Sequence, residues 1–280
     1  MAFVPSVERS NRRPPAHESD SKRIELTDPD ELDQELEGGR MTFLEHLDEL
    51  RKRLIASIIG IAVGSVIAFI FLDRTFHFIT QPMRTMLPNG SSLITTEPTE
   101  YFMLWFKVGF LSGLLIATPF VLYQVWLFVA PGLYSHEKRF AVPFVLFSSI
   151  FFFAGAAFSH YIAFPVTWTF FVNFRDDFVM FMPKLGSAFS LYVKMLLGFG
   201  IIFQMPVLVL AMARMGLVTG RFLLKQFKYA TLIIFILGAV LSPGGDIPSQ
   251  LMMAGPMMVL YVLSIGIAFV FQKRRPAEED

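Results

Sequence analysis

The sequence predicts an all-α polytopic membrane protein of six transmembrane helices, with both termini in the cytoplasm and with short helices five and six. Of the 280 residues, 54% are apolar and only 17% are charged, whereas soluble domains are about 45–50% apolar and about 25% charged. The apolar residues are concentrated in long runs. These runs lack the alternation of a barrel strand, so only helices can satisfy their backbone hydrogen bonds in lipid.

Residues 1–40 differ in composition from the rest of the chain. A basic piece, Arg9–Arg13, precedes an acid-rich run from Glu25 to Glu37, and Gly38-Gly39 closes the region. It has too few apolar residues to fold alone, which predicts a disordered cytoplasmic tail. The membrane domain is expected at residues 41–272, followed by a second cytoplasmic tail at 273–280.

The first element of the membrane domain is predicted to be an amphipathic helix from Thr42 to Arg53. Thr42-Phe43-Leu44-Glu45 fits a capping box, in which a hydroxyl and a carboxylate satisfy orphan backbone donors. Apolar residues then recur at helical spacing, with charged residues opposite them. We expect this helix to lie on the membrane surface and to lead directly into the first span.

Six apolar stretches follow, and they predict spans at about 54–72, 106–130, 140–172, 191–213, 228–242 and 249–271. The third is too long for one upright span, which predicts a tilted helix or one that continues past Pro165. The fifth has only 13 residues between Tyr229 and Leu241, about 20 Å of helix against a hydrocarbon core of about 30 Å. The turn Pro243–Pro248 then predicts a short hairpin of spans five and six.

The distribution of lysine and arginine predicts the orientation, because cytoplasmic loops are enriched in these residues. One side receives thirteen of them: Arg40, Arg51, Lys52, Arg53, Lys138, Arg139, Arg214, Arg221, Lys225, Lys228, Lys273, Arg274 and Arg275. The other side receives four: Arg74, Arg84, Arg175 and Lys184. Both termini are therefore expected in the cytoplasm.

Signatures of catalysis are missing from the sequence. The five histidines form no HExxH array, and neither a phosphate-binding glycine loop nor a nucleophile elbow occurs. The absence of cysteine excludes disulfides and thiolate metal sites. A net charge of +1 favours no nucleic-acid partner. We therefore predict no catalytic residues, no metal and no cofactor.

Four polar residues within or beside the spans have a structural and a functional interpretation. Lys107 and Lys194 are predicted near the outer ends of spans, where lysine stems reach the headgroups. Gln204 lies in mid-span within Phe203-Gln204-Met205-Pro206, and its amide serves either helix packing or a functional polar site. Asp246 stands in the Pro/Gly turn, where an Asx turn accounts for it. His160, at membrane depth, is expected to be structural.

Two carboxylates occur on the strongly basic cytoplasmic side. Glu49 could simply pair with Arg53 at i, i+4, and Glu137 could stabilise the first turn of span three. Alternatively, the two suit a ligand with two guanidinium groups, because arginine binds carboxylate through a bidentate fork.

The chain resembles the TatC family, the polytopic core of the twin-arginine protein translocase. The likeness covers about residues 41–272. It depends on His46–Leu54, on Leu122-Tyr-Gln-Val-Trp-Leu-Phe-Val-Ala-Pro-Gly-Leu-Tyr134 with Glu137, on Phe203–Pro206, and on Leu241-Ser-Pro-Gly-Gly-Asp246. The second stretch is long and distinctive.

The resemblance implies a function that composition does not reveal. Such proteins bind signal peptides with consecutive arginines and export folded proteins across the inner membrane, using the proton-motive force. They work in an oligomeric complex with TatA- and TatB-type single-span proteins. The resemblance assigns the arginine pair to Glu49 and Glu137, supported by Arg51, Arg53 and Phe128, on a concave helical bundle whose aromatic side chains face the signal's apolar segment.

Two further positions are implied to serve partner helices. Gln204 falls where many relatives have a glutamate, so proton relay is disfavoured but hydrogen bonding is retained. Asp246 matches an acidic family position near the outer turn. The alternative function is a secondary transporter of a small solute, with Gln204, Lys194 and Asp246 along its path. Such transporters often contain two related halves, and no internal repeat is evident here.

Overall fold

The computed structural model describes residues 43–88, 90–129, 141–174, 181–242 and 246–272. The chain divides into two compact units, Met1–Leu50 and Arg51–Asp280. Within the first unit, the described residues form the opening turns of one helix. The predicted tails, 1–40 and 273–280, lie outside the described residues.

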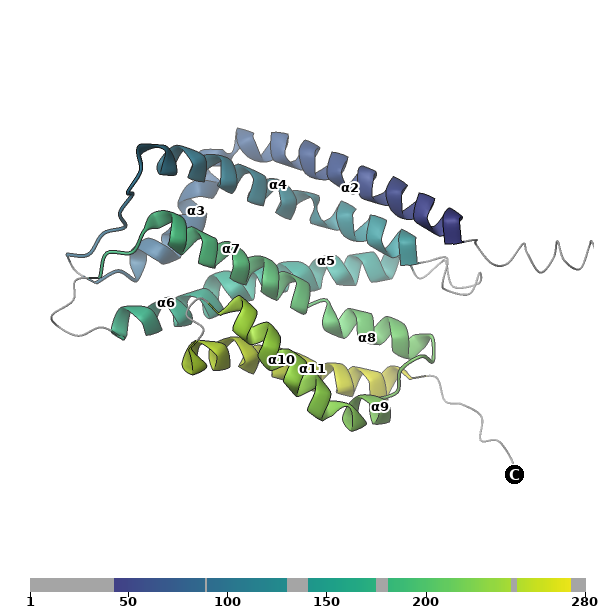
Figure 1. Ribbon diagram of the computed structural model, residues 1–280. Coiled ribbons are helices and arrows are strands. Elements are labelled where there is room, and N and C mark those ends of the chain that lie inside the picture. The colour runs from purple at the N-terminus through teal and green to yellow at the C-terminus, as the bar shows by residue number, and fades with distance from the viewer. Residues whose placement is uncertain (1–42, 89, 130–140, 175–180, 243–245, 273–280) are drawn as a thin grey trace, which may run out of the picture. The chain divides into compact units, whose positions relative to one another are not determined.

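Helices make up nearly all of the described chain (Figure 1). In chain order they are α2 (Phe43–Ile70), α3 (Leu72–Thr85), α4 (Pro98–Val129), α5 (Ala141–Phe158), the π-helical turn η3 (Ser159–Ala163), α6 (Phe164–Asn173), α7 (Leu185–Ile202), α8 (Met205–Arg214), α9 (Gly220–Lys225), α10 (Phe227–Leu241) and α11 (Ile247–Phe271).

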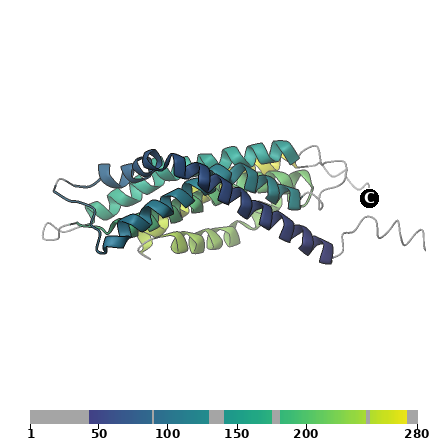
Figure 2. The same cartoon turned by 90° about the horizontal axis from the view of Figure 1, so that it is seen from above.

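Five stretches in the described chain are long and apolar enough to cross a membrane, and α10 is a shorter apolar helix. The five are Leu44–Ile70, Pro98–Val129, Val142–Asn173, Leu185–Arg214 and Ile247–Phe271. Each predicted span coincides with one of these six stretches, so the prediction of an all-helical polytopic membrane protein is confirmed. In both views α4, α5 and α7 run side by side (Figures 1 and 2).

Helix α2 corrects the expected separation between a surface helix and the first span. It runs from Phe43 to Ile70 without a break at Arg53. The physical reason is local, since no proline or glycine interrupts the chain between Phe43 and Gly60. The predicted capping residue Thr42 lies outside the described residues.

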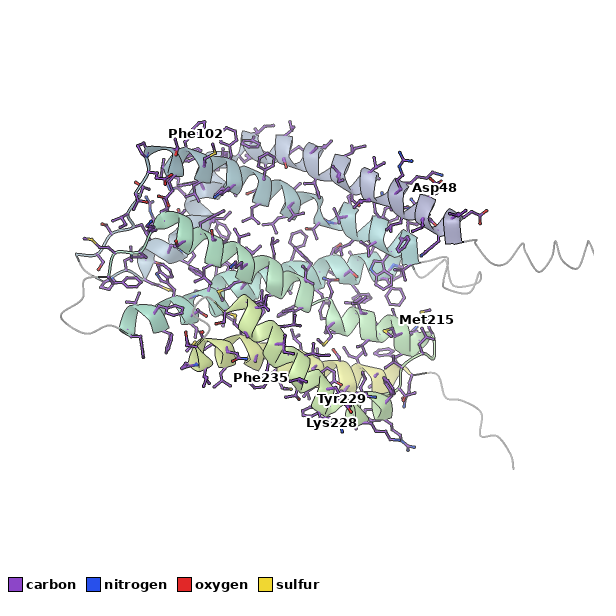
Figure 3. All side chains as sticks on the ribbon, in the orientation of Figure 1. Asp48, Phe102, Met215, Lys228, Tyr229 and Phe235 are labelled. Atoms are coloured by element: carbon purple, nitrogen blue, oxygen red, sulfur yellow. The ribbon has the colours of Figure 1, made fainter. Side chains whose placement is uncertain are left out.

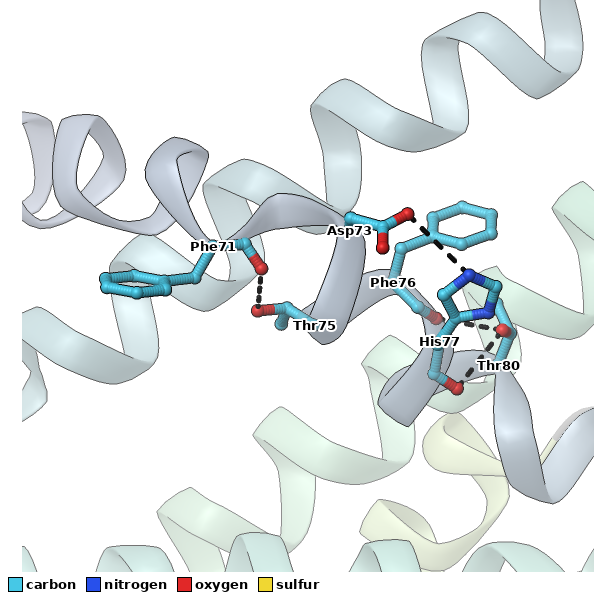
Figure 4. Close-up of polar contacts among 6 residues, drawn as sticks. All are labelled: Phe71, Asp73, Thr75, Phe76, His77 and Thr80. Carbon is cyan, nitrogen blue, oxygen red and sulfur yellow. Dashed lines mark hydrogen bonds and ion pairs between the residues drawn. The ribbon is translucent and has the colours of Figure 1, made fainter.

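Helix α3 was not predicted. Phe71 separates it from α2, and the hydroxyl of Thr75 donates to the Phe71 carbonyl at 3.0 Å (Figure 4). Its buried side chains, among them Phe76, Ile79 and Met83, recur at three- and four-residue spacing. The Phe76 ring stacks on Trp105 of α4 with centroids 4.9 Å apart. A helix that is apolar on one face only contains no continuous apolar run, which is why the sequence did not reveal α3.

Small residues bring α2 and α4 into close contact. A Cβ built on Gly113 of α4 would lie 2.6 Å from the backbone nitrogen of Ser65. On α2, a Cβ built on Gly64 would lie 2.6 Å from the carbonyl oxygen of Gly113. Close approach through small residues is the usual way in which transmembrane helices pack, because lipid offers no hydrophobic driving force between them.

Replacing Gly113 by alanine is expected to lower the stability of the bundle by about 1–3 kcal/mol, because the added methyl meets backbone atoms that cannot rotate away. The measurement is the midpoint of thermal unfolding in detergent. Gly255→Ala is the matched control, since a Cβ at Gly255 meets nothing within 4 Å. Equal midpoints for the two variants would show that the α2–α4 contact is loose.

The third long stretch continues past Pro165, which was one of the two alternatives that its length predicted, and contains a π-helical turn just before that residue. The backbone N–H of Phe164 donates to the Ser159 carbonyl, five residues earlier. Pro165 has no N–H for the carbonyl of Tyr161, so the regular ladder is interrupted here. The turn presents buried His160, whose Nδ1 lies 2.8 Å from the hydroxyl of Tyr192 on α7.

The predicted hairpin of the last two spans is present, but only one of its helices is short. Gln250 of α11 donates from Nε2 to the Phe235 carbonyl of α10 at 2.8 Å. Helix α10 has 15 residues, whereas α11 has 25, so the expectation of a short sixth helix is wrong. The cause is local: α11 starts directly after Asp246, which caps it, and continues through Pro256 to Phe271.

Candidate functional site

Arg53 links the start of the first span to the end of the second. Its Nη1 donates to Oε1 of Gln124 at 3.3 Å. Gln124 belongs to the penultimate turn of α4 and is only 6% exposed. A buried amide needs a hydrogen-bond partner, so Arg53 is held against α4 at this end of the bundle.

A second polar contact set begins one half-turn further along α4. The indole Nε1 of Trp126 donates to the hydroxyl of Ser148 on α5 at 2.7 Å, and the Trp126 ring stacks on Phe144 with centroids 5.0 Å apart. Gln204 donates from Nε2 to the carbonyl of the same Ser148 at 3.0 Å. Ser148 therefore connects α4, α5 and the α7–α8 junction.

Gln204 occupies a break between two helices. Helix α7 ends at Ile202 and α8 begins at Met205, because Pro206 has no N–H to donate to the carbonyl of Ile202. The Gln204 side chain is half-buried. Within the described chain, no donor reaches its Oε1, so one half of the amide serves helix packing and the other half remains an open acceptor.

The structure brings some of the predicted site residues together and leaves others untested. Phe128 lies one turn beyond Gln124 on α4 and is half-buried. Arg51 is exposed and stands about 200° around α2 from Arg53. Glu49 belongs to the unit Met1–Leu50, so its place relative to Gln124 stays a prediction. Glu137 lies outside the described residues.

Several basic residues share the end of the bundle where α4 and α8 finish and α10 begins (Figure 1). Figure 3 shows Met215 and Lys228 at this end and Phe102 at the opposite one. We call it the basic end, defined by Arg53, Arg214, Arg221, Lys225 and Lys228. The ammonium of Lys228 lies 4.8 Å from the ring centroid of Tyr229. A positively charged rim of this kind attracts anions and repels arginines, so an arginine ligand requires carboxylates here.

Asp246 acts as the N-cap of α11. Its Oδ1 accepts a hydrogen bond from the backbone N–H of Ser249 at 2.8 Å, and that bond holds the pKa of Asp246 below its usual value. The hydroxyl of Ser249 also lies 2.7 Å from that of Ser242 at the end of α10. The capping role alone therefore explains why an aspartate stands at this position.

The depressed pKa of Asp246 predicts a pH dependence. Its native pKa is lower than in the unfolded chain, so the stabilisation is complete above the usual aspartate pKa of about 4 and is lost as pH falls through the native value. Asp246→Asn retains a capping oxygen without the charge. At pH 7 the midpoint of thermal unfolding should therefore be higher for the natural protein than for Asp246→Asn. The difference between the two midpoints should disappear as the pH is lowered to 3.

The comparisons with known proteins agree with this architecture. The family model for TatC, the Sec-independent protein translocase protein, matches residues 45–256. The chain belongs to the TatC family. It is 43% identical over 244 residues to the TatC protein of Desulforapulum autotrophicum, covering 87% of this chain and 90% of that protein. It is 38% identical to the TatC protein of Koribacter versatilis, covering 89% and 94%.

A solved structure supports the same conclusion. A crystal structure of a twin-arginine translocase receptor TatC matches with a TM-score of 0.71 at 37% identity, covering 80% of this chain and 98% of that one. The chain is therefore a multi-pass membrane protein with the TatC fold and a component of the twin-arginine translocase. As a TatC-family transport component it is not an enzyme. Among the described residues, no cluster of His, Asp and Glu could hold a metal ion.

Three residues in the polar contacts of Arg53 and Gln204 with α4 and α5 were not identified as candidates from the sequence: Gln124, Trp126 and Ser148. Gln124 and Trp126 fall within the stretch that carries the resemblance, but neither was assigned a role. A lone amide within an apolar helix would have identified Gln124, because buried amides need partners. Ser148 offered no comparable pattern, since serines in spans commonly bond their own helix.

Proposed function

We propose that this TatC-family chain binds signal peptides with consecutive arginines at the basic end. The observation that carries the proposal is the Arg53–Gln124 hydrogen bond, which holds the start of the first span against the last turns of α4. Phe128 lies on the same turns. Glu137 stands four residues before Ala141, where α5 begins, in the sequence.

The chemistry of the proposed ligand requires carboxylates among these cations. A guanidinium forms two parallel hydrogen bonds with one carboxylate, so Glu137 and Glu49 suit two neighbouring arginines. Arg53 acts as a positioning residue, because its own guanidinium is turned toward Gln124. Arg51 and Phe128 supply the surrounding charge and an apolar surface for the residues next to the arginine pair.

The proposed orientation places the basic end in the cytoplasm, with both termini on that side of the inner membrane. Its support is the excess of lysine and arginine at this end. The proposal counts α10 as the fifth of six spans. Its 15 residues give about 22 Å of helix, short of a hydrocarbon core of about 30 Å. The bilayer would thin beside it.

Gln204 and Asp246 are proposed to face partner helices of the TatA and TatB type in an oligomeric complex driven by the proton-motive force. Gln204 is the better supported of the two. Its Nε2 donates to the Ser148 carbonyl, while the Oε1 of this half-buried side chain can accept a hydrogen bond from a polar residue of a partner. A neutral amide does not exchange protons at physiological pH, so the role is hydrogen bonding.

The proposed function predicts selective peptide binding. The detergent-solubilised protein should bind a signal peptide containing Arg-Arg about tenfold or more tightly than the same peptide with Lys-Lys, because lysine cannot form the bidentate fork. Fluorescence anisotropy of labelled peptides measures both affinities. Equal affinities for the two peptides, with partner proteins present as well as absent, would contradict the proposal.

A further inference from the structure

Two lysines lie well inside apolar helices. Lys107 is nine residues after Pro98, where α4 begins, and Lys194 is nine residues after Leu185, where α7 begins. At a rise of 1.5 Å per residue, each Cα is about 14 Å from the start of its helix. On α4, Phe102 lies between Lys107 and the helix start and is 60% exposed; Figure 3 labels it. Lys107 is thus deeper than the sequence predicted.

Both lysines line one groove of about 670 Å³ between α4 and α7. The remaining lining is almost entirely apolar and includes Phe110, Leu114, Phe189 and Leu197. Within the described chain, no carboxylate lines the groove, and neither lysine forms a hydrogen bond or an ion pair. Both side chains are exposed, so their ammonium groups are accessible to a ligand from the membrane.

Two like charges in an apolar groove need an anion. A lysine within the hydrocarbon region is unfavourable without a partner, and a second cation beside it adds repulsion. A lone surface lysine would reach water through its flexible stem. Two lysines at equal depth on neighbouring helices, directed into the same groove, instead create a site with complementary charge for an anion.

Helix α10 ends close to the level of these lysines. A Cβ built on Gly198 of α7 would lie 2.8 Å from Cδ2 of Leu241, the last residue of α10. Gly198 is four residues beyond Lys194, about 6 Å along the helix. Figure 1 shows α10 ending well short of the start of α7. A bilayer that adapts to such a short helix thins locally, which brings lipid headgroups down toward Lys194.

We propose that the groove binds one anionic phospholipid, with its phosphate between Lys107 and Lys194 and an acyl chain along the apolar wall. Lysine binds phosphate as a point charge, and the several phosphate oxygens can accept hydrogen bonds from both ammonium groups. The apolar wall formed by Phe110, Leu114 and Leu197 suits an acyl chain rather than a soluble anion.

The test compares lipid affinities of the full-length protein in detergent by native mass spectrometry, with phosphatidylglycerol and phosphatidylcholine as probes. The natural protein should bind phosphatidylglycerol about tenfold or more tightly, since each lysine near a membrane surface contributes about 1 kcal/mol toward anionic lipid. Lys107→Gln/Lys194→Gln should lose this preference. Lys107→Arg/Lys194→Arg should retain it, as should the control Arg74→Gln/Arg84→Gln, which removes two exposed charges from α3.

Three outcomes would overturn the proposal. Equal affinity of the natural protein for the two lipids would remove the site, and an unchanged preference in the glutamine variant would place it elsewhere. Competition by inorganic phosphate at equal concentration would show a site for a soluble anion. Two results together would show that the groove binds a partner helix instead. The purified protein would show no preference for phosphatidylglycerol, and a co-expressed single-span protein with a carboxylate in its membrane segment would no longer co-purify with the glutamine variant. None of these outcomes depends on binding of a signal peptide.

Discussion

Replacing Glu137 by alanine is expected to reduce binding of an Arg-Arg signal peptide by about 10- to 150-fold, because a hydrogen bond between charged groups contributes about 1.5–3 kcal/mol. The surrounding charge enlarges the effect. Without this carboxylate, the arginine pair meets a basic end that contains Arg53, Arg221 and Lys225. Anisotropy titrations with Arg-Arg and Lys-Lys peptides measure the loss, and the two peptides should then bind equally weakly.

Two variants control this prediction. Glu137→Asp keeps the charge and should retain part of the preference for Arg-Arg. Glu97→Ala removes an exposed carboxylate at the opposite end, before α4, and should leave binding unchanged. Insertion in the membrane and the unfolding midpoint should match the natural protein for all three. If Glu137→Ala binds the Arg-Arg peptide with undiminished affinity, the residue has no part in recognition.

Replacing Trp126 by alanine is expected to destabilise the bundle by about 3–5 kcal/mol. The indole is only 6% exposed, stacks on Phe144 and donates to Ser148. It belongs to a small buried cluster with Val207 and Ala211 of α8. Alanine would leave a cavity where α4, α5 and α8 meet. The measurement is unfolding by heat or denaturant in detergent, followed by circular dichroism.

The separate contributions of stacking and hydrogen bonding can be distinguished. Trp126→Phe keeps an aromatic ring against Phe144 but removes the donor to Ser148, so it should cost about 1–2 kcal/mol. Trp105 offers a comparison, because its indole stacks on Phe76 of α3 at the opposite end of the bundle. Trp105→Phe should perturb the packing at that end only and leave the contacts of Trp126 intact. A Trp126→Ala protein as stable as Trp126→Phe would show that α4 and α5 close around the cavity.

Most of the fold could be predicted because span formation depends on local composition. A run such as Leu185–Arg214 must be helical in lipid wherever it packs. Helix α3 was missed for the complementary reason. Its apolar residues occupy one face only, and that face is buried because α4 and α6 cover it. Nothing within the 14 residues of α3 specifies those neighbours.

The site was predicted only in part. Glu49 and Glu137 were noted as two carboxylates on a basic side, whereas Arg51, Arg53 and Phe128 came from family resemblance alone. The structure adds that Arg53 is held by Gln124. Gln204 illustrates the limit of pattern analysis. Its position before Pro206 predicted a polar group in mid-span, but its partner, the Ser148 carbonyl, is 56 residues away in the chain.

Composition and periodicity alone thus established an all-helical membrane protein, the places of its spans and the shortness of α10, since each depends on residues adjacent in the chain. Tertiary packing decided which polar groups meet. Lys107 and Lys194 are 87 residues apart in sequence yet share one groove, because α4 and α7 pack together with a particular rotation about their axes. That rotation results from contacts distributed over the whole bundle, and no local sequence pattern encodes it.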